Sequence, residues 1–99
     1  MAELKRFTVR IAFPNVTSNQ QQELLRDFPE ELDHRPHLQP AQVFWDEAHT
    51  RVVVQVTDEA WNADQSARGM AEELFEASSA ILSDMEGIHV EVLSVTPAD

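Results

Sequence analysis

The feature of this sequence that most constrains its fold is the order in which two hydrophobic periodicities follow one another. Apolar residues alternate with polar ones in 5–14, 41–45, 50–57 and 88–95, and a period of two is typical of strands with one buried face. After the first and third of these segments the apolar residues recur every three or four positions, which indicates amphipathic helices. The predicted order is therefore β-α-β-β-α-β.

Right-handed crossovers turn this order into a four-stranded antiparallel sheet with two helices on one face, an α+β architecture. This is the ferredoxin-like fold, and in its usual strand order, 4-1-3-2, the first and last strands are neighbours. A chain of 99 residues has the length of one domain. We therefore expect a single ferredoxin-like domain over 1–99, with a frayed tail at 96–99.

The first helix is predicted to begin with a capping box, in which the side chains of Ser18 and Gln21 satisfy amides at the helix start. Pro29 is expected to stop or kink this helix, because the residue before a proline is pushed out of the helical region. One further turn can follow, with Leu32 continuing the apolar stripe.

The second helix has the stronger pattern and lies within 62–87. Asn62 or Asp64 can cap its start, and Gly87 suits the left-handed position past its end. Gly69 inside the helix costs about 1 kcal/mol relative to alanine. Close backbone packing at Gly69 would be one reason to accept that cost.

The two ends of the chain, VRIAFP and GIHVEVLSV, resemble the first and last strands of small regulatory ferredoxin-like modules such as the ACT type. The resemblance covers about fifteen residues and consists mostly of strand pattern. The turn PNVTSN lacks the glycine with which ACT modules usually approach an amino-acid ligand. No ligand-binding residues are therefore carried over to this chain.

The net charge of −11 is distributed unevenly along the chain. Residues 1–45 hold five basic and six acidic side chains, whereas residues 46–99 hold two basic and twelve acidic ones. The acidic half would repel phosphates, so we expect no binding to nucleic acid and none to an anionic membrane. A basic protein partner is compatible with it. Because no signal peptide or apolar run of about 20 residues is present, we expect a soluble, cytoplasmic protein.

Few residues here suggest catalytic or metal chemistry. The absence of cysteine excludes disulfides, zinc fingers and thiol nucleophiles. In DHRPHLQP (33–40), Pro36 separates His34 from His37 and disfavours a helical alignment of the two. We interpret this segment as a connector, with a ligand-binding or acid–base loop as the alternative. We expect no metal site and no cofactor, and we identify no catalytic residue.

A sheet with helices on one side leaves its other face uncovered, and the alternation assigns residues to that face. Several are apolar, and exposed apolar patches mark partner surfaces. Arg10 and Glu91 are expected to face each other if the first and last strands are neighbours. The predicted ligand or partner surface consists of Arg10, Phe44, Val53, His89, Glu91, Leu93 and Val95.

Three classes of function are compatible with these observations. The favoured one is a small non-enzymatic binding or regulatory module that forms a homodimer through its open sheet face. The second is an enzyme of the dimeric α/β-barrel kind, in which two sheet faces enclose a pocket for a small-molecule ligand. The third is an acidic inhibitor or immunity-type factor that binds a basic protein. Whether the protein is an enzyme stays open, with the absence of a catalytic constellation favouring a binding role.

Overall fold

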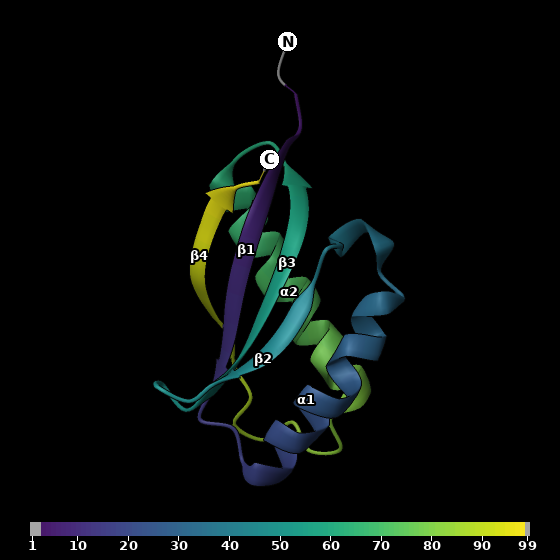
Figure 1. Ribbon diagram of the computed structural model, residues 1–99, viewed down its shortest axis with the longest axis vertical. Coiled ribbons are helices and arrows are strands. Elements are labelled where there is room, and N and C mark those ends of the chain that lie inside the picture. The colour runs from purple at the N-terminus through teal and green to yellow at the C-terminus, as the bar shows by residue number, and fades with distance from the viewer. Residues whose placement is uncertain (1–2, 99) are drawn as a thin grey trace.

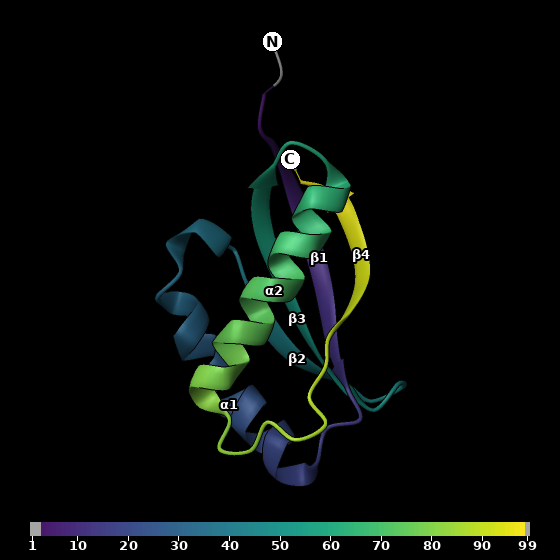
Figure 2. The same ribbon diagram turned by 180° about the vertical axis from the view of Figure 1, so that it is seen from behind.

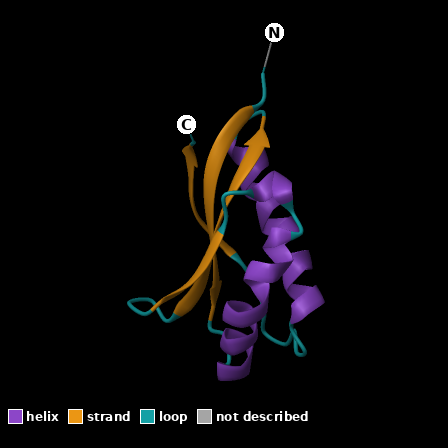
Figure 3. Ribbon diagram, turned by 45° about the vertical axis from the view of Figure 1, so that its right-hand side comes forward, coloured by secondary structure: helices purple, strands orange, loops and turns teal. Residues whose placement is uncertain are grey.

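The computed structural model describes residues 3–98 and contains one antiparallel sheet covered on one face by two helices (Figures 1 and 3). A short 3-10 helix, η1, lies between the first helix and the second strand. No helix in this range is long and apolar enough to cross a membrane. The elements are β1 (Lys5–Pro14), α1 (Ser18–Asp33), η1 (Pro36–Leu38), β2 (Gln42–Asp46), β3 (Arg51–Ala60), α2 (Ala63–Ile81) and β4 (Glu91–Pro97).

The strand order is β2-β3-β1-β4, which is β4-β1-β3-β2 when followed from the other edge of the sheet. β1 pairs with β3 from Lys5↔Ala60 to Pro14↔Arg51, and its other side pairs with β4. The first and last strands are therefore neighbours, and all three pairings are antiparallel. These features confirm the α+β class, the single four-stranded antiparallel sheet and the two helices.

The core lies between the sheet and the helices. Alternate residues of β1 and β3 point toward the helices, as the period of two predicts, and Val9, Ile11 and Val54 are completely buried. Phe13 and Phe28 meet edge to face, with 5.7 Å between their ring centroids. Full burial of one such side chain contributes about 1.5–3 kcal/mol. Figure 2 shows α2 crossing this face in front of β1.

Helix α1 differs from its prediction at both ends. Its capping box is formed by Thr17 and Gln20, one residue earlier than expected. The helix also continues through Pro29 to Asp33, although a proline inside a helix costs about 3 kcal/mol. Burial of Leu32, which is 2% exposed, opposes that cost because the apolar stripe continues past the proline.

Helix α2 is capped by Asn62, whose side chain accepts a hydrogen bond from Gln65 N, and it ends at Ile81. Gly87 adopts a positive φ of 77°, but in the loop that follows the helix. The expected close packing at Gly69 is wrong, because a Cβ placed there would have no atom within 4 Å.

Strand β4 begins at Glu91, later than expected, and its pairing with β1 is interrupted by a bulge between Arg10 and Ile11. The strand reaches Pro97, and Ala98 N donates to Arg6 O at 2.9 Å. Residues 96–98 are therefore hydrogen-bonded to β1 where a frayed tail was predicted. Asp99 lies outside the described residues.

Candidate functional site on the uncovered face of the sheet

The uncovered face of the sheet is built from rows of side chains that cross its strands. Residues that pair directly in an antiparallel sheet point to the same side, so the register fixes each row. The other parity of β1 and β3 forms the core, which leaves these rows on the side without helices (Figure 3). From β4 toward β2 the rows are Glu91–Ala12–Val53–Phe44, Ser94–Arg10–Gln55–Gln42 and Thr96–Thr8–Thr57.

Four of the seven predicted surface residues share this face in two adjacent rows. They are Arg10, Phe44, Val53 and Glu91. Arg10 and Glu91 do not lie directly opposite each other, because the register pairs Arg10 with Ser94 and Glu91 with Ala12. The expected direct pair across β1 and β4 is therefore wrong.

The other three predicted residues are elsewhere, and the β4 boundary and bulge explain why. Val95 pairs with Val9 and packs against the core on the helix side, because the bulge shifts the phase of the alternation. Leu93 lies at the bulge and is half-buried. His89 precedes the strand, in an exposed loop where its Nδ1 lies 3.3 Å from Gly87 O.

The uncovered face is less apolar than predicted. Val53 lies between its cross-strand partners Ala12 and Phe44 and is only 2% exposed. Phe44 is half-buried, and the other two rows are polar. The large exposed apolar residues lie outside these rows and are Leu4, Trp61, Phe75 and Val92. The expectation of an exposed apolar patch on this face is thus wrong, and the face presents mostly hydroxyl, amide and charged groups.

Arg10 occupies the middle of this face in a fixed position. Its Nε donates to Gln55 Oε1 at 2.7 Å, and its guanidinium carbon lies 6.0 Å from the centroid of the Phe44 ring. A cation at this distance is attracted by the ring face. Within residues 3–98 Arg10 forms no ion pair. The arrangement therefore presents a positioned cation whose charge no carboxylate of this chain neutralises.

A second polar cluster fixes the turn between β2 and β3. Asp46 Oδ2 accepts hydrogen bonds from Arg51 Nε and His49 Nδ1, both at 2.9 Å. Partial burial raises the pKa of Asp46, but the hydrogen bonds and charges of Arg51 and His49 outweigh it and hold this pKa below its usual value. The turn projects beyond the sheet (Figure 3). The cluster accounts for His49 as part of the hairpin.

Charge separates by layer in the folded chain. The four strands hold four basic and four acidic residues and have no net charge. The helices α1 and α2 hold two basic and nine acidic residues, a net charge of −7. The uneven charge seen along the sequence is therefore an acidic helical layer on a neutral sheet.

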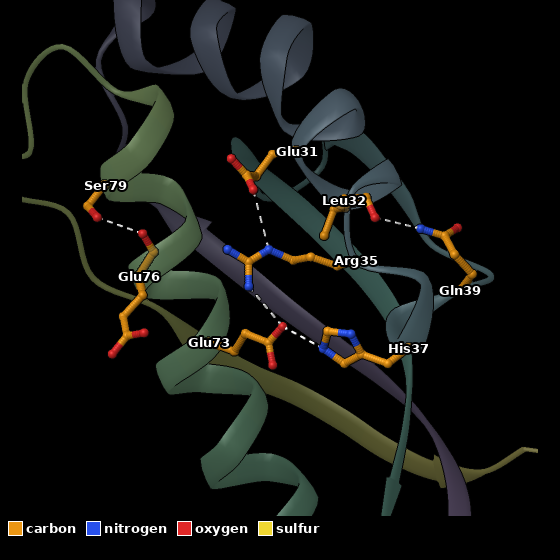
Figure 4. A network of polar contacts seen from close by, with 8 residues as sticks. All are labelled: Glu31, Leu32, Arg35, His37, Gln39, Glu73, Glu76 and Ser79. Carbon is orange, nitrogen blue, oxygen red and sulfur yellow. Dashed lines mark hydrogen bonds and ion pairs between the residues drawn. The ribbon is translucent and has the colours of Figure 1, made fainter.

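The segment DHRPHLQP connects α1 to β2 and is anchored to both helices (Figure 4). Leu38 is completely buried beneath the 3-10 turn. Glu73 of α2 binds Arg35 Nη1 at 3.1 Å and His37 Nε2 at 2.9 Å through the same oxygen, Oε2. Gln39 Nε2 donates to Leu32 O at 2.8 Å. These contacts support the connector interpretation.

His34 lines a shallow hollow of about 270 Å³ between α1 and the end of α2, separate from the contact of His37 with Glu73. The other lining residues are Asp27, Glu30, Glu31, Ala80 and Ile81. Among residues 3–98, no group of three histidine or carboxylate side chains is arranged to hold a metal ion.

Comparisons of the chain with protein-family models, with curated proteins and with solved structures found no match.

Proposed function

We propose that this protein is a non-enzymatic binding module that self-associates through the uncovered face of its sheet. The proposal includes a ferredoxin-like fold, supported by the β-α-β-β-α-β order and by the strand order β4-β1-β3-β2. It also includes action in the cytoplasm, as expected from the sequence. The partner at the uncovered face is a second copy of the chain.

The observation that carries the proposal is the separation of charge between the layers. Two copies that met through their helices would bring together layers of −7 each, and like charges in contact cost several kcal/mol. Strands with no net charge carry no such penalty. Contact through the sheets also leaves both acidic layers in water, where they keep the assembly soluble.

The polar groups of the uncovered face suit an interface whose geometry is largely formed in advance. Arg10 is held by Gln55 and Phe44, and Thr57 is 6% exposed with its hydroxyl donating to Pro40 O at 3.2 Å. Ordering a free long side chain on binding costs about 0.5–1.5 kcal/mol, and held side chains avoid most of that cost. Val53 and Ala12 give the centre of the face a dry apolar floor.

A pair of charge-adding variants tests the proposal. Thr8→Glu places a carboxylate in the middle strand of the uncovered face, and Gln22→Glu adds the same charge to an exposed position of α1. Sedimentation velocity over a concentration series should find a dimer for the unmodified protein and for Gln22→Glu, and monomer for Thr8→Glu at the same concentrations. Circular dichroism checks that both variants stay folded. A wild-type monomer at hundreds of micromolar, or a Thr8→Glu dimer as tight as the wild type, refutes the proposal.

A further inference from the structure

The uncovered face carries two opposite charges that have no partner in their own chain. Arg10 and Glu91 are both exposed, and neither forms an ion pair within residues 3–98. They lie in adjacent rows on neighbouring strands, since Arg10 pairs with Ser94 and Glu91 pairs with Ala12. An arginine held in place and a carboxylate nearby are complementary to the same two groups on another copy.

Two-fold symmetry makes that complementarity exact in number. In a dimer of identical faces every contact occurs twice, so residue i of one copy meets residue j of the other and the reverse. A two-fold axis that runs between the two sheets and passes midway between Arg10 and Glu91 places each residue over the other in the second copy. Both charges of both copies are then paired, without any like-charge contact at these four positions.

We propose that the Arg10 guanidinium of one copy binds the Glu91 carboxylate of a second copy, and that this reciprocal pair sets the register of the face-to-face dimer. The inference rests on the self-association proposed above. Gln55 occupies Nε of Arg10, so the two terminal nitrogens remain for the carboxylate, and they match its two oxygens. Phe44 supports the guanidinium from below and limits the freedom that it loses on binding.

A charge-swap series tests the pair directly. Arg10→Glu and Glu91→Arg each place like charges together at both symmetry-related contacts, and the double variant Arg10→Glu/Glu91→Arg exchanges the two charges. Close charge pairs at interfaces couple by factors of about ten or more each, so each single variant should raise the dimer dissociation constant about a hundredfold. The double variant should recover most of this loss. Arg68→Glu, an exposed change of the same charge on α2, should leave the constant within about threefold.

The outcomes separate this inference from the proposed function. If the single variants dimerise as tightly as Arg68→Glu, or the double variant stays as weak as the singles, the Arg10–Glu91 pair is refuted. If Thr8→Glu nevertheless dissociates the dimer in that case, self-association through the sheet stands. A wild-type protein that is monomeric throughout refutes both. Thermal unfolding of each variant, followed by circular dichroism, identifies losses due to misfolding, and Arg10→Gln supplies a milder variant if Arg10→Glu does not fold.

Discussion

Removing the side chain of Gln20 should destabilise this protein far more than a change to one exposed glutamine normally does. Gln20 is 2% exposed at the start of α1. Its Oε1 accepts a hydrogen bond from Thr17 N at 2.9 Å, which completes the capping box. Its Nε2 donates to Asp84 O at 3.0 Å and to Glu86 O at 3.1 Å, in the loop between α2 and β4.

The magnitude follows from these three hydrogen bonds. Each contributes about 1 kcal/mol net, and a buried group that loses its partner costs about 1–3 kcal/mol. Water can reach some of the freed loop carbonyls, because Asp84 and Glu86 are exposed residues. We therefore expect Gln20→Ala to lower the free energy of unfolding by about 2–4 kcal/mol.

The control is Gln22→Ala, two residues further along the same helix, where the side chain is exposed and forms no hydrogen bond with residues 3–98. Its effect should stay within about 0.5 kcal/mol. Urea unfolding of both variants and the wild type, followed by circular dichroism, measures the difference. If Gln20→Ala and Gln22→Ala unfold at the same urea concentration, Gln20 does not tie α1 to the loop before β4 as we argue.

Two further predictions concern other positions. Gly69→Ala should raise the free energy of unfolding by about 0.5–1 kcal/mol, because alanine is the better helix former and an added Cβ meets no atom within 4 Å; a lower urea midpoint would contradict this. The pKa of Asp46 is lowered in the folded state from the usual 3.8, so its ionised form stabilises the fold above that pH and this stabilisation is lost as the pH falls below it. Asp46→Asn should therefore be less stable than the wild type at pH 7 and closer to it near pH 3, by urea unfolding at both values; an equal gap at both pH values would show that the ionisation of Asp46 does not matter.

The sequence predicts the order of elements and most of the core because strand and helix periodicities are long and regular here. Val9, Ile11 and Val54 fall on the expected side of the sheet. Pro29 was misjudged as a helix stop because local backbone preference is weak against burial of the apolar stripe, including Leu32, beyond it.

The candidate site was predicted only in part, and the reason is the bulge in β4. Period-two alternation assigns His89, Glu91 and Val95 to one face, but a bulge shifts the phase and carries no signal in this sequence. Val53 was correctly placed on the uncovered face, yet its burial depends on Phe44 across the strand boundary. The contact of Arg10 with Gln55 was missed as well, since it requires the exact register of β1 against β3.

The most direct test of self-association through the uncovered face uses a single spin label. The chain has no cysteine, so Gln42→Cys, at an exposed position on β2 at the edge of this face, provides one labelling site. Labelled protein is mixed with ¹⁵N-labelled wild type, and paramagnetic broadening of the wild-type amides is measured by NMR. We predict broadening that is concentrated in the four strands and weak in α1 and α2. Broadening centred on the helices, or none at concentrations of hundreds of micromolar, would contradict the account.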